Sequence, residues 1–182
     1  MKFKKVLLFL FICFQFCSKK NNTPQSLLFQ SVKNGNLAKI NIAIAKGADI
    51  QAKDKNGNSV LMLACKQETP RVAKFLVYST QINVNSQNHN GDTALIIAAR
   101  NGNSAIVRFL LSKKSRARAK TKSELVDINV KNKAGETALT AAKKNGFLII
   151  VRLLRQAGAK QWVDFVNNLC VKIPQTWIES DI

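Results

Sequence analysis

Apolar and polar positions recur along the chain in one arrangement. A turn glycine is followed two residues later by a hydroxyl residue, and then by a mostly apolar run that contains small residues. The arrangement occurs as "GNSVLMLACK" at 57–66, "GDTALIIAAR" at 91–100 and "GETALTAAKK" at 135–144, and "SLLFQSVKNG" at 26–35 is a fourth version without the leading turn. Self-similarity with a period of about 33 residues is typical of a solenoid, in which one unit cannot bury its apolar face alone.

Each version predicts a pair of helices joined by a tight turn. Hydroxyl residues that can cap the first helix are Ser26, Ser59, Thr93 and Thr137. Leucines predicted to face the core are Leu28, Leu61, Leu95 and Leu139, and small residues that allow close helix approach are Ser31, Ala64, Ala98 and Ala142. The first helix is expected to end at a residue that adopts a left-handed conformation, at Gly35, Gly102 and Gly146, with Glu68 in this place in the second repeat.

The segments between the helix pairs predict projecting fingers, in which two extended arms meet at a β-turn: "GADIQAKDKNG", "INVNSQNHNG" and "DINVKNKAG". Together these columns resemble the ankyrin repeat family over roughly residues 24–160. The resemblance implies an all-α repeat solenoid of helix–turn–helix pairs with β-turn fingers. The family's histidine, which hydrogen-bonds to the neighbouring repeat, is replaced here by Phe29, Met62, Ile96 and Thr140. We therefore expect mostly apolar packing at that column.

The predicted domain organisation places the repeat array at residues 25–160. Its units are about 25–53, 54–87, 88–131 and 132–160, and the third unit carries an insertion at 113–124 that is basic from 113 to 122. Residues 161–182 predict a C-terminal capping helix and tail, because Trp162, Val166 and Leu169 recur at helical spacing after an apolar last repeat. The alternative is that Trp162 or Trp177 anchors a partner.

Residues 1–17 have the features of an export signal. Lysines at 2, 4 and 5 precede an apolar run at 6–14, which is much shorter than the roughly 20 residues that span a bilayer. With a polar tether at 18–24, the layout resembles a bacterial lipoprotein signal and implies lipidation of Cys17, although Phe14 and Phe16 depart from the usual residues before that cysteine. We expect export to the bacterial cell envelope, either to the periplasm or as a membrane-anchored lipoprotein. The alternative is that Cys13 and Cys17 are ordinary apolar residues of a signal or of an uncleaved anchor.

The composition favours an acidic partner, and the motifs that catalysis would need are missing. The net charge is +19, from 29 Lys and Arg against 10 Asp and Glu, and a solvated basic surface is the simpler alternative. The single histidine, His89, lies in a predicted finger turn and forms no metal-ligand spacing with Cys65 or Cys170. Phosphate-binding glycine motifs are absent from the sequence. We therefore expect a protein that is not an enzyme, with no catalytic residue, no metal site and no cofactor.

The predicted partner-binding surface is the concave, recessed face where ankyrin arrays bind their partners. One column of this face is basic in every repeat, at Lys33, Lys66, Arg100 and Lys144. The next column is an amide in every repeat, at Asn34, Gln67, Asn101 and Asn145. The fingers add Lys53, Lys55, His89, Lys131 and Lys133.

These features predict a non-catalytic protein–protein interaction module that binds an acidic protein surface on its concave basic face. The alternative is a binder of an anionic polymer or a membrane surface, which would use the same column and residues 113–122. Nucleic acid is disfavoured as a partner, because no aromatic residues that could stack on bases interleave with the basic column. No small-molecule substrate is expected.

Overall fold

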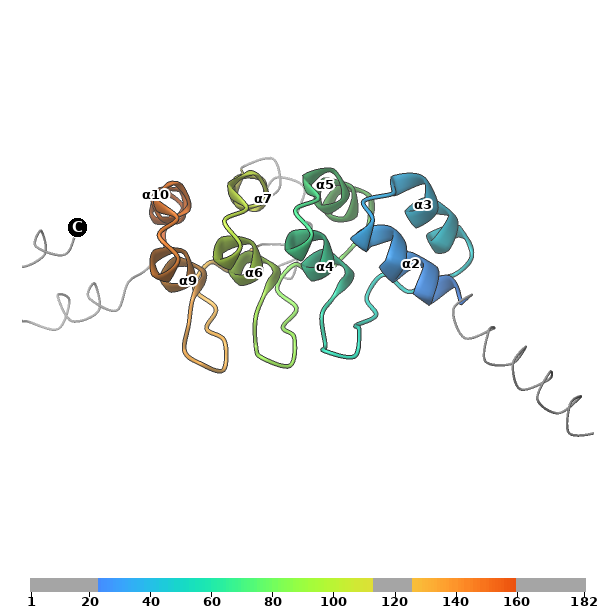
Figure 1. Ribbon diagram of the computed structural model, residues 1–182, viewed down its shortest axis with the longest axis horizontal. Helices are drawn as coiled ribbons and strands as arrows, with labels where there is room; N and C mark the ends of the chain where they lie inside the picture. Colours follow the sequence, from blue (N-terminus) through green and yellow to red (C-terminus); the bar gives the residue numbers. More distant parts are fainter. Residues whose placement is uncertain (1–22, 113–125, 160–182) are drawn as a thin grey trace, which may run out of the picture.

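The computed structural model describes residues 23–112 and 126–159. Within these ranges the chain forms helices in four antiparallel pairs, stacked side by side along one axis (Figure 1). The pairs are α2 (Pro24–Lys33) with α3 (Leu37–Ala45), α4 (Val60–Lys66) with α5 (Pro70–Ser79), α6 (Ala94–Arg100) with α7 (Ser104–Leu111), and α9 (Ala138–Lys144) with α10 (Leu148–Gln156). The predicted all-α repeat solenoid is confirmed.

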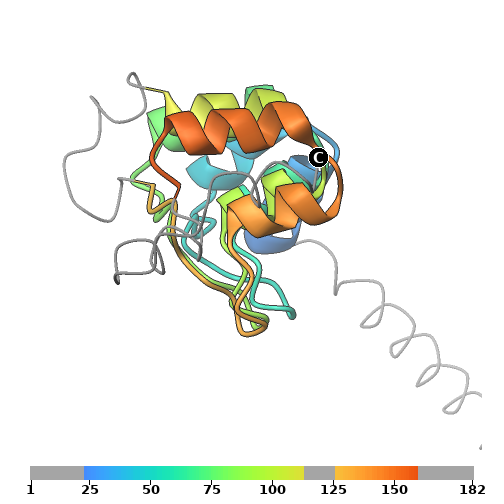
Figure 2. The ribbon, with the colours of Figure 1, turned by 90° about the vertical axis from the view of Figure 1, so that its left-hand side faces the viewer.

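The helices form two layers, and the fingers project from one side of them. Viewed along the array, α4, α6 and α9 superpose in an inner layer, and α5, α7 and α10 superpose in an outer layer (Figure 2). Each inner helix packs against its neighbours, α2 on α4, α4 on α6, and α6 on α9. The finger loops follow the same path in successive repeats, so equivalent residues stand in rows along the array (Figure 2).

The core runs continuously through all four pairs. The predicted leucine column is buried, and none of Leu28, Leu61, Leu95 and Leu139 is more than 2% exposed. Each such side chain contributes about 1.5–3 kcal/mol relative to an exposed one. The small-residue column is also buried, at Ser31, Ala64, Ala98 and Ala142. The repeats therefore share one core rather than four separate cores.

Hydroxyl caps begin the inner helices, as the sequence predicts, except in the first repeat. Ser59, Thr93 and Thr137 are N-cap residues whose side-chain oxygens accept from the backbone N–H three residues later. In the first repeat the prediction of Ser26 is wrong, because Thr23 is the N-cap and accepts from the Ser26 N–H. The helix starts earlier because Pro24 can occupy its first turn, where a missing N–H is tolerated.

The inner helices end in a left-handed residue, as predicted. Three of the four repeats use glycine, with φ of +69° at Gly35, +79° at Gly102 and +72° at Gly146. Glu68 holds the same place in the second repeat with φ of +54°, and it is the one non-glycine residue with positive φ in the described ranges. A side chain costs about 1–2 kcal/mol in this conformation, so the second repeat carries a local strain that the others lack.

Each finger is built on an Asx turn. The side-chain oxygens of Asp54, Asn88 and Asn132 accept from the backbone N–H groups two and four residues later. Backbone hydrogen bonds then join neighbouring tips, from His89 N–H to the Asn56 carbonyl and from Lys133 N–H to the Asn90 carbonyl. The fingers are therefore connected to one another at their tips.

Gly57 marks the closest approach between two fingers. Its φ is +75°, and a Cβ placed there would lie 2.6 Å from Cδ2 of His89 and 2.9 Å from the His89 backbone nitrogen. Any side chain at this position would push the next finger away. Glycine is thus required at this position both by the turn and by the stacking of repeats.

Several predicted segments lie outside the described residues: the export signal at 1–17 with Cys17, most of the tether at 18–24, the insertion at 113–124 and the capping segment at 161–182. Across the portion that the structure describes, the helices are all too short or too polar to cross a membrane.

We predict that Glu68→Gly raises the free energy of unfolding by about 0.5–1 kcal/mol, because it removes left-handed strain and gives back part of that gain as unfolded-chain entropy. Urea denaturation followed by circular dichroism measures the change. The matched control is Gly146→Ala, which has the same backbone conformation and no atom within 4 Å of the new Cβ, and it should lose about 1 kcal/mol. A destabilised Glu68→Gly protein would show that the glutamate side chain makes a compensating contact.

Candidate functional site

The basic column predicted from the sequence lies at the C-terminal ends of the inner helices. Lys33, Lys66, Arg100 and Lys144 are the last residues of α2, α4, α6 and α9. The amide column supplies the C-cap residue after each one: Asn34, Gln67, Asn101 and Asn145. These helix ends and the fingers together form a surface that we call the recessed face.

A groove lies in the middle of the recessed face, with a volume of about 470 Å³. The ends of α4 and α6 contribute Lys66, Arg100 and Asn101, and the second finger contributes His89, Asn90 and Asp92. The exposed lining is mainly amide and charged groups, which suits hydrogen bonding to a polar partner. The groove therefore brings Lys66, Arg100 and His89 together, as the sequence predicted for one surface.

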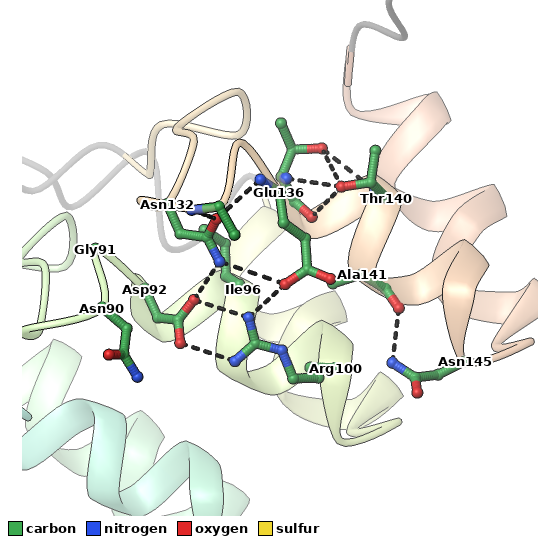
Figure 3. Close-up of polar contacts among 12 residues, drawn as sticks. Asn90, Gly91, Asp92, Ile96, Arg100, Asn132, Glu136, Thr140, Ala141 and Asn145 are labelled. Carbon is green, nitrogen blue, oxygen red and sulfur yellow. Dashed lines mark hydrogen bonds and ion pairs between the residues drawn. The ribbon is translucent and has the colours of Figure 1, made fainter.

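Arg100 is held by two carboxylates from different repeats (Figure 3). Its two terminal nitrogens each lie 2.8 Å from an oxygen of Asp92, in a bidentate pair, and Nη2 also donates to Glu136. Asn132 closes the cluster, because its amide donates to Asp92 over 2.8 Å and to Glu136 over 3.3 Å. Asp92 precedes α6 and Glu136 precedes α9, so this cluster, the Arg100 clasp, joins the third repeat to the fourth.

Electrostatic interactions within the Arg100 clasp favour the charged forms of Asp92 and Arg100. Burial raises the pKa of Asp92, but hydrogen bonds from Arg100 and Asn132 and the charge of Arg100 outweigh burial and lower the pKa below its usual value. Hydrogen bonds from the guanidinium to Asp92 and Glu136 raise the pKa of Arg100. The side chain of Asp92 is only 4% exposed, so its charge depends on these partners.

The structure changes the interpretation of two residues that the sequence assigned to partner binding. Arg100 lies in the predicted column, but its guanidinium is already paired within the Arg100 clasp, so its positive charge has a role in folding. Lys53 likewise donates from Nζ to the Gln87 carbonyl in the next finger over 2.8 Å. Arg100 therefore contributes to folding as well as standing in the basic column.

The other lysines of the column are exposed. Lys33, Lys66 and Lys144 all lie at the surface, and within residues 23–112 and 126–159 none of them forms an ion pair. A positive charge at a helix C-terminus gains about 0.3–1 kcal/mol from the helix dipole, which is a small folding contribution. Lys55, Lys131 and Lys133 are also exposed on the fingers.

Sequence reasoning missed the polar residues that connect the repeats. The residue after each turn glycine takes part, because Asn88 donates to Asn58 over 2.9 Å and Asn132 donates to Asp92. The signal was present in the sequence, since the position after the turn glycine is polar in every finger, at Asn58, Asp92 and Glu136. These polar contacts add to the apolar packing at the column of Met62 and Ile96, both of which are buried.

Candidate nucleophiles and metal ligands do not converge in the part of the chain that the structure describes. Cys65 is fully buried, and burial raises the pKa of its thiol to about 12, so it stays protonated. His89 covers Gly57 at an exposed finger tip. Among the described residues, no group of three or more His, Cys, Asp or Glu side chains could hold a metal ion.

Comparison with known proteins identifies the family. The sequence model of the family described as ankyrin repeats (3 copies) matches residues 28–123, which is more than half of the chain. The chain belongs to the ankyrin-repeat family. Ankyrin repeats generally mediate protein–protein interaction and are typically not catalytic.

Three longer proteins are similar to part of this chain. XBAT34 of Arabidopsis thaliana is 33% identical over 96 residues, which cover 52% of this chain and 26% of the relative. Human transient receptor potential cation channel subfamily A member 1 is 30% identical over 95 residues, or 52% of this chain and 8% of the relative. The human photoreceptor ankyrin repeat protein is 39% identical over 59 residues, or 32% and 13%. The chain thus spans about a quarter or less of each relative.

We predict that Arg100→Ala lowers the free energy of unfolding by about 2 kcal/mol, between the values typical of exposed and of buried ion pairs. The matched control, Lys66→Ala, should change it by no more than about 0.5 kcal/mol. Because the pKa of Asp92 is lowered in the fold, its contribution is present above pH 3.8 and is lost as the pH falls through the lowered value. Urea titrations at neutral and acidic pH should show the gap between the variants closing in acid; equal losses at neutral pH would contradict a structural role for Arg100.

Proposed function

We propose that this protein is a non-catalytic interaction module whose recessed face binds an acidic protein surface. The observation that carries the proposal is the row of exposed lysines at the inner-helix ends, Lys33, Lys66 and Lys144. They stand beside a row of amides and, in the middle of the face, a polar groove. Within the described residues none of the three forms an ion pair, and Lys33 alone has a neighbouring carboxylate, Asp54, whose pKa its charge helps to lower, so Lys66 and Lys144 are the most available to a partner.

The Arg100 clasp limits which part of the face attracts an acidic partner. Two carboxylates face one guanidinium there, so the centre of the row carries slight negative charge rather than positive charge. The attraction therefore comes from the two sides of the clasp, from Lys33 and Lys66 before it and from Lys144 after it. Steering by these charges raises the association rate, and it weakens as salt shortens the range of the field.

We predict that Lys66→Glu with Lys144→Glu weakens partner binding by roughly 2 kcal/mol, near thirtyfold, because two attractive contacts become repulsive. Stability should fall by no more than about 1 kcal/mol per substitution, since both side chains are exposed and each change replaces a favourable charge at a helix C-terminus by an unfavourable one. The measurement is retention of the acidic protein captured from extracts of the source organism, followed by titration with the purified partner.

The matched control for this double variant is Arg71→Glu with Lys74→Glu, two exposed residues of the outer helix α5. Equal loss of binding in both double variants would mean that only net charge matters. Salt-labile retention on many immobilised polyanions, with no single acidic protein, would support the alternative of an anionic polymer or membrane surface.

The proposal includes export to the cell envelope, with lipidation of Cys17, on the basis of the signal-like residues 1–17. We predict that the mature protein lacks residues 1–16 and partitions with membranes. Stable partitioning requires that the lipid on Cys17 carry two or more acyl chains, because one chain does not anchor a protein stably. The intact mass of protein purified from its source measures both cleavage and modification. An unmodified chain that starts at Met1 in the cytosol would contradict export, and a cleaved, soluble chain with a free Cys17 thiol would contradict lipidation alone.

A further inference from the structure

The last repeat exposes large apolar side chains at the start of α10. Leu148 is 77% exposed and Ile149 is 64% exposed, the highest values among the large hydrophobic residues at 23–112 and 126–159. Two adjacent apolar side chains left in water forgo the burial free energy of roughly 1.5–3 kcal/mol each. This end of the array therefore has an apolar surface that a further segment could cover.

Comparison of the outer helices indicates that, within the described residues, α10 lacks the neighbour that α5 and α7 have. Ala73 in α5 and Val107 in α7 stand four residues after their N-caps and are fully buried, since α5 packs on α7 and α7 packs on α10. Val151 holds the same position in α10 and is only partly buried. Figure 1 shows α10 at one end of the described array, with no described helix beyond it.

A basic groove lies beside this apolar surface. Between α7 and α10 it has a volume of about 440 Å³ and is lined by Arg108, Ile149, Arg152, Leu153 and Gln156. Arg108 and Arg152 occupy the same position in successive outer helices, and both are exposed. The groove and the exposed leucine together form a surface that is apolar and positively charged, which we call the α10 surface.

We propose that residues 161–182 of this same chain dock on the α10 surface. The segment begins shortly after Ala159, the last residue described, so it is tethered next to that surface. Three of the ten acidic residues of the chain belong to it, Asp164, Glu179 and Asp181, against a single base, Lys172. It also contains both tryptophans, Trp162 and Trp177. A segment that is both acidic and rich in large apolar residues is complementary to a surface that is basic and apolar.

The docked segment supplies the neighbour that α10 lacks. Its apolar side chains cover Leu148 and Ile149, and its carboxylates face Arg108 and Arg152 at the rim of the groove. Tethering makes this contact intramolecular, so a modest contact energy is enough to keep it closed. The contact involves the outer helices and the end of the array, so it is independent of binding at the recessed face.

Tryptophan fluorescence of the full-length chain tests this docking, because both tryptophans lie in the segment and none lies elsewhere. In the unmodified protein we expect emission shifted to the blue of the urea-unfolded protein and protection from quenching by acrylamide, a neutral quencher. Arg108→Glu with Arg152→Glu should shift the emission red and raise the quenching constant toward the unfolded value. Adding Glu179→Lys and Asp181→Lys to that variant should restore protection.

The matched control for the charge reversal is Arg71→Glu with Lys74→Glu in α5, which changes the charge equally and should leave both readouts unchanged. A second pair of variants separates docking from unfolding: Ile149→Ser should expose the tryptophans, whereas Ile42→Ser, on the outer helix α3 at the far end, should not. Circular dichroism checks that each array remains folded. Tryptophans that are fully accessible in the unmodified protein, or equally protected in all variants, would overturn the proposal.

Discussion

Burial of the inner-helix leucines and alanines against the next repeat is the interaction on which the rest of the structure depends. An inner helix of seven residues, such as α4 or α6, is too short to be stable in water by itself. It persists because both of its flanks are covered, as the fully buried positions of Leu61 and Ala98 show. The fingers, the groove and the rows of charge all take their geometry from this stacking.

Polar contacts between repeats set the register that apolar stacking alone leaves loose. Asn103 donates to the Cys65 carbonyl over 2.7 Å, and the Arg100 clasp joins the third repeat to the fourth. Because Asp92 and Glu136 pair with Arg100 in this cluster, the middle of the recessed face loses positive charge. One arginine thus affects both the stability of the array and the pattern of charge that it presents to a partner.

Much of the fold could be predicted from the sequence because its determinants are local. The buried Leu61 column and the strained place of Glu68 follow from residue type and spacing within one repeat. The roles of Arg100 and Glu136 could not be predicted in this way, because their contact joins residues 36 apart in the chain and depends on the register between repeats. For the same reason, the sequence indicated where charges lie but not which of them are already paired.

The bonds between fingers give the array a mechanical property. Lys53 donates to the Gln87 carbonyl, and the Gln87 amide donates to the Lys131 carbonyl, so a line of hydrogen bonds crosses three fingers. A load applied at the tip that carries His89 is therefore shared with the fingers on both sides. The three fingers therefore move together rather than independently, and a partner that displaces one fingertip displaces the neighbouring fingertips as well.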